Sequence, residues 1–209
     1  LILYLECDLS AFKGALLQVG RRHFSDIAVQ AESLLRRKKR MVVFDMNNTL
    51  IQTFDLLEHL GAQIGVLDKM KEIRASHGDK NFVNSITERV ALLKGAPTKL
   101  LDGIEQHIKF TKGALFLCRA LKKLGFKLAC ISSGFDVIST CVKEELGLDY
   151  AFHNTLQTEM TPEGEVFTGK LEMPIVDGIR KMDLLTYLTE KEGEFNLTLQ
   201  QHVVMLIDA

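Results

Sequence analysis

The sequence predicts an α/β fold: a parallel sheet with helices on both faces and an inserted helical cap. Three observations predict it. Apolar runs at 41–45, 126–131 and 203–207 read as buried strands, because each is short and bounded by polar or turn residues. Helical periodicity fills the segments between these runs, and Gly125 and Gly147 stand where two of the helices end. Strands that alternate with helices are typical of a parallel sheet buried on both faces.

Residues 1–33 are predicted to form a separate, partial domain. A strand, a helix capped by Ser10 and a second strand follow one another there, with no partner strand nearby, which is typical of the tail of a small α+β domain. Residues 34–40 form a basic linker that ends in Arg36-Arg37-Lys38-Lys39-Arg40. We interpret this linker as a solvated connector before a buried strand; a nucleic-acid or targeting patch is the alternative.

The main domain is predicted to span residues 41–209. Residues 52–108 carry helical periodicity without a convincing strand, and this segment is too long for a simple crossover between parallel strands. We therefore expect an inserted helical cap there. Residues 154–172 alternate around Pro162-Glu163-Gly164, which indicates a hairpin, and a helix capped by Asp177 follows. The core is expected to be truncated at its C-terminal end.

Composition limits the classes of function. With 209 residues, 46% of them hydrophobic and 25% charged, the chain is long enough for one substantial core. A net charge of −1 argues against broad binding of nucleic acid. No apolar run approaches the roughly 20 residues that span a bilayer, and no secretory signal opens the sequence. We therefore expect a cytoplasmic protein without a membrane partner, or an organellar one if the true N-terminus is missing.

Cysteine and histidine spacing argues against a metal site built from these residues. The four cysteines form no CxxC pair, and reduced thiols are the expected state. The six histidines show neither HExxH nor His-x-His spacing. A histidine-built metal site is therefore not expected.

Polar residues follow three of the predicted strands, and these are the candidate site. Asp45, Ser132 and Asp208 each stand where an apolar run ends, and the carboxyl ends of parallel strands share one edge of the sheet. The two carboxylates suit Mg²⁺ that keeps several waters. Residues 132–134 lie just before a helix, where backbone N–H groups favour an anion, and Lys181 adds a positive charge. Together these groups meet the requirements of phosphoryl transfer.

Six short stretches of the chain carry a resemblance to a known family. They are Val42-Val43-Phe44-Asp45-Met46, Thr49-Leu50-Ile51-Gln52, Glu88-Arg89-Val90-Ala91-Leu92-Leu93-Lys94-Gly95, Gly134-Phe135, Glu145-Leu146-Gly147-Leu148-Asp149-Tyr150-Ala151-Phe152 and Pro174-Ile175-Val176-Asp177. Through them, residues 41–209 resemble the phosphoserine phosphatases of the haloacid dehalogenase (HAD) superfamily. Residues 1–33 resemble the end of the regulatory ACT domain that precedes some bacterial members. The resemblance implies a HAD-like Rossmannoid fold and a role in serine biosynthesis.

The resemblance also implies roles for individual residues. Asp45 is the nucleophile that forms an aspartyl-phosphate, and Arg89 holds the carboxylate of a phosphorylated amino acid such as O-phospho-L-serine. Mg²⁺ is held by Asp45, Asp208 and the backbone carbonyl of Asn47. The phosphate-binding residues are Ser132, Ser133, Gly134 and Lys181.

Five positions depart from the family pattern: Asn47, Phe54, Ser133, Ile207 and Ala209. Asn47 stands where the family has the aspartate that protonates the leaving alkoxide and later activates water, a contribution of typically ~10²–10⁴-fold. Phe54 replaces the glutamate that reads the substrate amino group, and a regular segment would point the adjacent Asp55 elsewhere. Ser133 adds a side chain beside the phosphate, and the last motif ends at Ile207-Asp208-Ala209.

These departures lead to three hypotheses. The first is a Mg²⁺-dependent phosphomonoester hydrolase that acts through an aspartyl-phosphate and is impaired at Asn47. The second is a catalytically inactive pseudophosphatase that serves as a structural or binding subunit of a larger assembly. The third is a sensor of phosphate or phosphoamino acids. A homodimer and a subunit of a larger complex both stay open as states of assembly.

Overall fold

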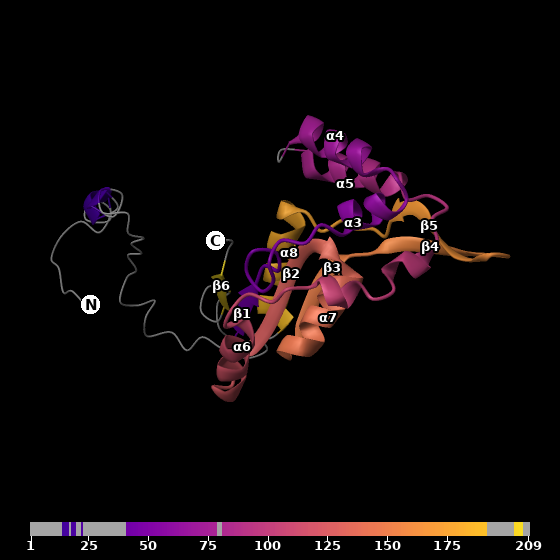
Figure 1. Cartoon of the computed structure of the whole chain (residues 1–209). Coiled ribbons are helices and arrows are strands. Elements are labelled where there is room, and N and C mark those ends of the chain that lie inside the picture. The colour runs from indigo at the N-terminus through magenta and orange to yellow at the C-terminus, as the bar shows by residue number, and fades with distance from the viewer. Residues whose placement is uncertain are drawn as a thin grey trace. The chain divides into compact units, whose positions relative to one another are not determined.

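The computed structural model describes residues 14–16, 18–19, 22, 41–78, 81–191 and 203–206 (Figure 1). For residues 189–191 and 203–206 it describes the backbone alone. The chain divides into two compact units, Leu1–Lys38 and Lys39–Ala209. The described residues of the first unit are helical. The two strands predicted within residues 1–33 lie outside the described residues, and the ACT-like identity of this unit stays a prediction.

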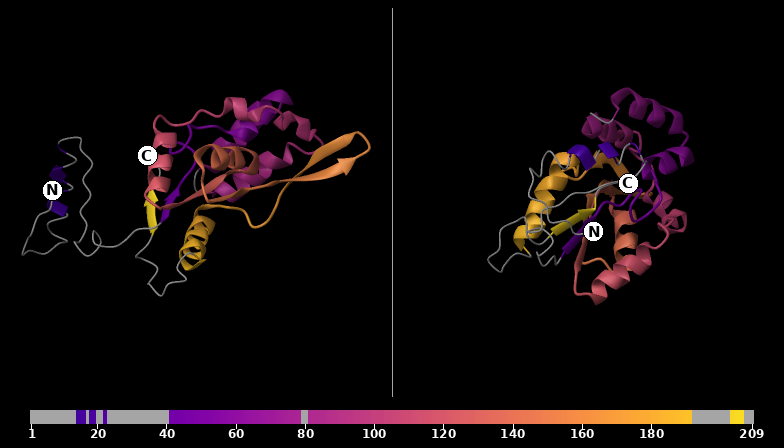
Figure 2. Two further views of the ribbon diagram at one scale, coloured as in Figure 1. Left: turned by 90° about the horizontal axis from the view of Figure 1, so that it is seen from below. Right: turned by 90° about the vertical axis from the view of Figure 1, so that its left-hand side faces the viewer.

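A four-stranded sheet forms the centre of the second unit (Figures 1 and 2). Its strands are β1 (Met41–Phe44), β2 (Lys127–Phe135), β3 (Tyr150–Asn154) and β6 (Val203–Leu206). They lie in the order β3-β2-β1-β6, and every neighbouring pair is parallel. Val43, for example, is paired with Ala129 on one side and with Met205 on the other. The predicted parallel sheet is therefore confirmed.

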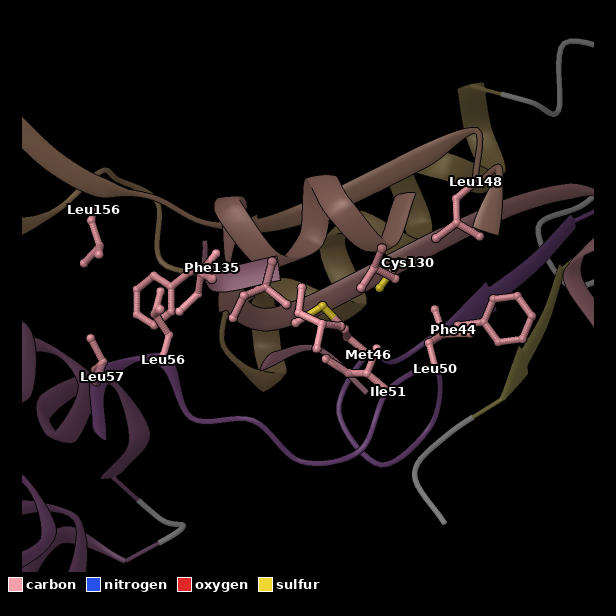
Figure 3. Close-up of a cluster of buried hydrophobic side chains, with 14 of the residues drawn as sticks. Phe44, Met46, Leu50, Ile51, Leu56, Leu57, Cys130, Phe135, Leu148 and Leu156 are labelled. Atoms are coloured by element: carbon pink, nitrogen blue, oxygen red, sulfur yellow. The ribbon is translucent and has the colours of Figure 1, made fainter. Parts of the chain in front are cut away.

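Helices cover both faces of this sheet, as predicted. They are α6 (Ala114–Lys123), α7 (Asp136–Leu146) and α8 (Gly178–Lys191). Val42 and Phe44 belong to the larger apolar cluster, which includes side chains of α6 and α7. Figure 3 shows Phe44 in this cluster together with Met46 and Cys130. Met41 and Val43 belong to a second cluster with Leu184 of α8. Alternate residues of β1 thus face opposite layers, which requires an apolar residue at every position of the strand.

The segment between β1 and α6 forms the helical insertion that the sequence predicts. It contains α3 (Leu56–Gln63), α4 (Leu67–His77), α5 (Phe82–Ala91) and the 3₁₀ turns η2 (Thr98–Leu101) and η3 (Ile104–His107). Its two ends run side by side, because the Gln52 amide donates to the Lys109 carbonyl at 2.8 Å and the Thr111 amide to the Leu50 carbonyl at 2.9 Å. The insertion therefore leaves and re-enters the core at one place.

A hairpin joins the core to the far side of this insertion. Its strands β4 (Leu156–Thr161) and β5 (Gly164–Leu171) are antiparallel, as the sequence predicts, and they extend away from the sheet beside the insertion (Figure 2). Phe167 exchanges backbone hydrogen bonds of 2.8 and 2.9 Å with Gly95 and Ala96. Gly169 has a φ of 78°, and a Cβ there would lie 2.9 Å from the Lys94 Cβ. The hairpin is thus a second attachment of the insertion.

One boundary differs from the expectation and bears on the site. We expected the second strand to end at Ile131, but β2 continues to Phe135, because Phe135 pairs with Asn154 after a shift in register. Residues 132–134 therefore lie in the irregular end of a strand, directly before α7. Within the described ranges, no helix is long and apolar enough to cross a membrane.

Candidate functional site

A cavity of about 440 Å³ lies where the carboxyl ends of the strands face the helical insertion. We call the residues from the strand ends and α8 the core wall, and those from the insertion the cap wall. The core wall consists of Asp45, Asn47, Ser132, Ser133, Gly134 and Lys181. The cap wall consists of Phe54, Asp55, Arg74, Phe82, Ser85 and Arg89. The expected convergence at the strand ends is therefore present for all six residues of the core wall, and Arg89 faces them from the insertion; Asp208 lies outside the described residues.

An ion pair between two distant parts of the chain is the centre of the core wall. The Lys181 Nζ lies 2.7 Å from the Asp45 Oδ1, and both side chains are largely buried. Asp45 follows β1 directly, and Lys181 lies in the first turn of α8. The Asp177 side chain caps that turn by accepting a 2.7 Å hydrogen bond from the Arg180 amide, which stabilises the helix start. The lysine thus places a positive charge where an anion can meet the Asp45 carboxylate.

The segment 132–134 forms a tightly packed cradle beside this ion pair. Ser132 is buried, and its Oγ accepts a hydrogen bond of 2.9 Å from the Gly134 amide. A Cβ at Gly134 would lie 2.7 Å from the Met46 Cε and 3.1 Å from the Ser132 Oγ. Contacts under 3.0 Å force a neighbour to move, so a side chain at position 134 would require the flexible end of the buried Met46 side chain to shift.

Asn154, which the sequence analysis missed, holds the backbone of the 132–134 segment in place through a hydrogen bond from its side chain. Its side chain is buried, donates to the Ser133 carbonyl at 2.9 Å and accepts from the Val176 amide at 2.7 Å. Asn154 thereby joins the end of β2 to the segment that leads into α8. The sequence does show a polar residue at the end of a short strand, which could have marked Asn154 as a candidate. Its hydrogen-bond partners are 21 and 22 residues away along the chain, so the sequence alone did not reveal them.

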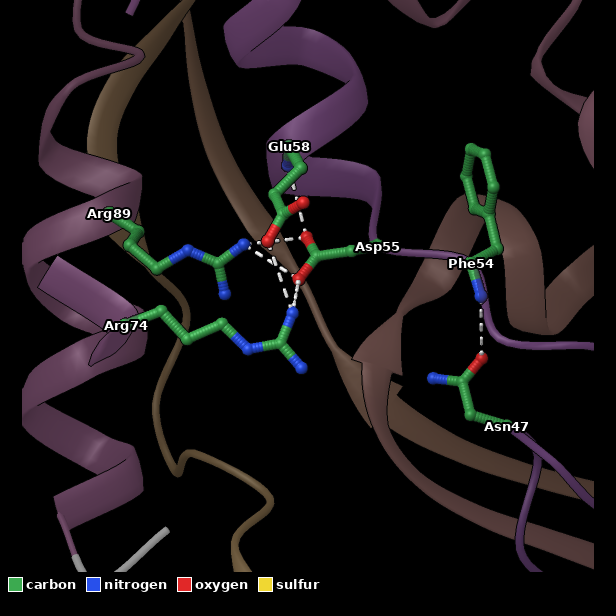
Figure 4. Close-up of polar contacts among 6 residues, drawn as sticks. All are labelled: Asn47, Phe54, Asp55, Glu58, Arg74 and Arg89. Carbon is green, nitrogen blue, oxygen red and sulfur yellow. Dashed lines mark hydrogen bonds and ion pairs between the residues drawn. The ribbon is translucent and has the colours of Figure 1, made fainter. Parts of the chain in front are cut away.

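Asn47 lies in a tight turn next to the nucleophile position. The Met46 carbonyl accepts hydrogen bonds from the amides of Thr49, Leu50 and Ile51, which closes the turn. The Asn47 Oδ1 accepts a long hydrogen bond of 3.4 Å from the Phe54 amide (Figure 4). The amide side chain therefore fits the position, but it has no proton to give or take near neutral pH.

The cap wall holds a cluster of charges that the sequence did not predict. The Arg89 Nη2 donates to both oxygens of Asp55, at 2.6 and 2.7 Å. The Arg74 Nη1 binds the carboxylates of Asp55 and Glu58, each at 3.1 Å (Figure 4). Asp55 also caps α3, because its Oδ1 accepts from the Glu58 amide at 3.0 Å. The expectation that Asp55 points elsewhere is thus wrong: the segment turns into a helix at this residue, and its side chain lines the cavity.

The Cys130 thiol, which interacts electrostatically with Asp45 and Lys181, does not compete with Asp45 as a nucleophile. Burial raises the pKa of Cys130 to about 12, and the Asp45 carboxylate acts in the same direction. A thiol is reactive as its thiolate, so Cys130 is a packing residue. It is free, as are Cys118 and Cys141, in line with the predicted reduced thiols; Cys7 lies outside the described residues.

The described residues supply part of a site for a hard cation. Within the described ranges, no three His, Cys, Asp or Glu residues are grouped so that they could hold a metal ion. Asp45 offers a carboxylate, and the backbone carbonyl of Asn47 belongs to the same turn. Mg²⁺ commonly binds one or two protein carboxylates and keeps several waters. Asp45 with the Asn47 carbonyl therefore fits Mg²⁺ in this mode, and no soft-metal site is indicated.

Comparisons with known proteins agree with this geometry. The family model of haloacid dehalogenase-like hydrolases matches residues 42–195. The chain is 38% identical over 188 residues to a phosphoserine phosphatase of Archaeoglobus fulgidus, covering 89% of this chain and 53% of that protein. It is 32% identical over 161 residues to a phosphoserine phosphatase of Methanocaldococcus jannaschii, covering 76% and 74%. Against the first curated relatives it spans between 40% and 60% of their length.

Solved structures give the same result. The chain matches apo phosphoserine phosphatase with a TM-score of 0.66 and 30% identity, covering 82% of this chain and 78% of that one. It matches a HAD family hydrolase of Salmonella enterica serovar Typhi with a TM-score of 0.74 and 25% identity, covering 96% and 66%. A phosphoserine phosphatase with bound substrate matches with a TM-score of 0.67 and 29% identity, covering 81% and 79%.

Proposed function

The chain belongs to the haloacid dehalogenase-like hydrolase family, and we propose that its core wall accepts the phosphoryl group of a small phosphomonoester onto Asp45. The observation that carries this proposal is the 2.7 Å ion pair between Asp45 and Lys181 beside the 132–134 cradle. A nucleophilic carboxylate next to a cation and backbone donors is suited to a phosphoryl anion. The names of the relatives make O-phospho-L-serine a candidate substrate.

The first chemical step forms a bond between an Asp45 oxygen and phosphorus while the bond from phosphorus to the alcohol oxygen breaks. Lys181 would balance the charge of the phosphoryl oxygens, and the Ser132 hydroxyl, which accepts from the Gly134 amide, could donate its own proton to one of them. The electron pair leaves on the alcohol oxygen as an alkoxide, which needs a proton. Asn47 stands beside Asp45 but cannot supply that proton, so we expect this step to be slow for alkyl phosphates and fast for donors with a stable leaving group.

We propose Mg²⁺ as the cofactor, held by Asp45, the Asn47 carbonyl and Asp208. The bound cation would neutralise charge on the phosphoryl group. Removing Mg²⁺ with a chelator should therefore abolish phosphorylation of Asp45, and adding it back should restore the reaction.

The second step, hydrolysis of the aspartyl-phosphate, needs a group that takes a proton from water. Asn47 cannot take it, so an aspartyl-phosphate should persist once formed. Incubation with acetyl phosphate and Mg²⁺ should give a stable phospho-adduct that intact-mass measurement detects. The isosteric Asp45→Asn variant is the control and should give no adduct. Equal labelling of both proteins, or no labelling of either, would contradict a working nucleophile.

A second candidate is a pseudophosphatase that binds phosphate or phosphoamino acids without turnover, as a sensor or as a subunit of a larger assembly. Asn47 favours it, since the position lacks a titratable group. Stabilisation of the fold by inorganic phosphate, with neither turnover nor a phospho-adduct, would support the sensor. Co-purification in a defined complex would support the subunit.

A further inference from the structure

The Asp55–Arg89 pair controls which part of a ligand the cap wall can bind. We propose that Asp55 is a specificity-determining residue that occupies Arg89, so that the cavity favours phosphomonoesters of alcohols without a carboxylate over those of amino acids. The proposal rests on the proposed function in one respect: the core wall takes the phosphoryl group, which leaves the alcohol part of the ligand to face the cap wall.

The first support is the hydrogen bonding of Asp55. Its two oxygens accept four hydrogen bonds: two from the Arg89 Nη2, one from the Arg74 Nη1 and one from the Glu58 amide. A carboxylate offers about four lone-pair sites, so these contacts use its acceptor capacity. Asp55 is therefore fixed by its neighbours, and it has little capacity left for an ammonium group of a ligand.

The second support is the burial of Arg89. Its side chain is 9% exposed, whereas that of Arg74 is 57% exposed. Solvent screens the charge of Arg74, so the buried guanidinium is the group that would attract an anion. That guanidinium already has a carboxylate at 2.6 Å, and a ligand carboxylate placed on it would also meet the negative charge of Asp55. Like charges at such distances are costly in a partly buried site.

The third support is the apolar part of the cavity surface. The aromatic rings of Phe54, Phe82 and Phe135 line it together with Ile86 and Ile138. These side chains offer apolar contact and no charge. A ligand whose alcohol part lacks a carboxylate can lie against them without displacing Asp55.

An N–H group of Arg89 that Asp55 does not use is compatible with the proposed preference for alcohols without a carboxylate. The Arg89 Nε is buried and has no hydrogen-bond partner among the described residues. An uncharged acceptor, such as a hydroxyl or a carbonyl oxygen, can satisfy one N–H group without competing with Asp55 for the cation. We therefore expect neutral oxygen-bearing alcohols to be accepted as well as apolar ones.

The test compares two esters that differ by one carboxylate, O-phospho-L-serine and O-phosphoethanolamine. Their dissociation constants are measured by calorimetry with Mg²⁺, for the unchanged chain and for Asp55→Asn. Asparagine is about as good a helix N-cap as aspartate, so this variant keeps the cap of α3 and removes the charge. The unchanged chain should bind O-phosphoethanolamine at least as tightly, and Asp55→Asn should shift the ratio of the two constants toward O-phospho-L-serine by roughly tenfold or more.

The control variant is Asp149→Asn. Asp149 also accepts from one backbone amide and pairs with two cations, Lys122 and Lys127, but it does not line the cavity. Its substitution should leave the ratio unchanged. Asp55→Ser, which keeps a capping hydroxyl, gives a second variant if the asparagine variant does not fold.

Three outcomes would overturn the proposal. They are an unchanged ratio in both Asp55 variants, tighter binding of O-phospho-L-serine than of O-phosphoethanolamine by the unchanged chain, and no binding of either ester to any of the proteins. The proposed function is judged by a separate result, the labelling of Asp45 by acetyl phosphate. Labelling with an unchanged ratio would reject the role of Asp55 alone, and a shifted ratio without labelling would reject the phosphoryl transfer alone.

Discussion

The core wall and the cap wall of the cavity both contain a buried or largely buried cation next to a carboxylate, but the two pairs differ in their surroundings. Lys181 and Asp45 lie beside a glycine-containing cradle, where an anion can reach them. Arg89 and Asp55 are bound within a cluster that also includes Arg74 and Glu58. The comparison teaches that two ion pairs in one cavity can differ in their surroundings: the first borders the 132–134 segment, and the second belongs to a charge cluster that also caps α3.

Restoring the missing acid–base group should have the largest effect. Asn47→Asp should raise the rate of phosphomonoester hydrolysis with Mg²⁺ by about 10²–10⁴-fold, because general acid–base catalysis contributes that much. Steady-state release of inorganic phosphate from O-phosphoethanolamine and O-phospho-L-serine measures it. The double variant Asp45→Asn with Asn47→Asp is the control and should stay inactive. No gain in the single variant would mean that the core wall lacks more than a proton donor.

Removing the cation from each wall in turn should separate their roles. Lys181→Gln should lower the rate of Asp45 labelling by acetyl phosphate by roughly 10²-fold, because a buried charge next to the transferred group is lost. Arg74→Gln in the cap wall should lower it far less, since Arg74 is 57% exposed and its charge is screened.

Lys170→Gln is the matched control for the lysine, because Lys170 is exposed in β5 and does not line the cavity. Its labelling rate should equal that of the unchanged chain. Equal losses in Lys181→Gln and Arg74→Gln would remove the distinction between the two walls.

A steric change in the cradle should have a smaller effect, on stability. Gly134→Ala would place a Cβ 2.7 Å from the flexible end of the buried Met46 side chain, and moving that end should cost about 1 kcal/mol, the low end of the usual range for overpacking. Denaturant unfolding gives the change in free energy. Gly178→Ala is the control, because a Cβ there meets nothing within 4 Å. A neutral result for Gly134→Ala would show that the turn around Met46 yields easily.

The smallest effect is expected from pH. Burial lowers the pKa of His153 in β3 below its ordinary value of 6.5. Burial and the nearby His107 likewise lower the pKa of His59, whose ring lies next to Phe54. The folded chain then binds fewer protons than the unfolded chain, so stability should be full above about pH 7 and fall as the pH drops below 6.5.

Melting temperatures across this range provide the measurement. His153→Gln should flatten the slope more than His59→Gln, because His153 is the more deeply buried of the two. A slope that neither variant changes would assign the pH dependence to other groups.

Much of the fold could be predicted because its signals are local. The apolar run at 41–44 has to be buried on both faces, and Gly147, with a φ of 66°, ends α7 where the sequence places it. The core wall could be predicted for a related reason: parallel strands bring their ends together, so Asp45 and Ser132 had to lie near each other.

The cap wall could not be predicted, because its contacts depend on packing between helices. Asp55 meets Arg89 across 34 residues and Arg74 across 19, and its direction is set by the start of α3 at the next residue. Asn154 was missed for the same reason, since its partners become neighbours only when β2 and the segment before α8 come together.

The two attachments of the helical insertion limit how the cavity can open. One is the pairing of Gln52 with Lys109, and the other is the pairing of β5 with residues 95–97. The insertion also packs against α7 through η3, which is close in sequence to the first attachment, so a swing about the line through the two attachments is its easiest motion. Entry of a ligand would then depend on the angle between the insertion and the core rather than on the flexibility of the connecting loops. Helix α4 takes part in neither attachment, so it would move farther than Phe54, which lies beside the first one.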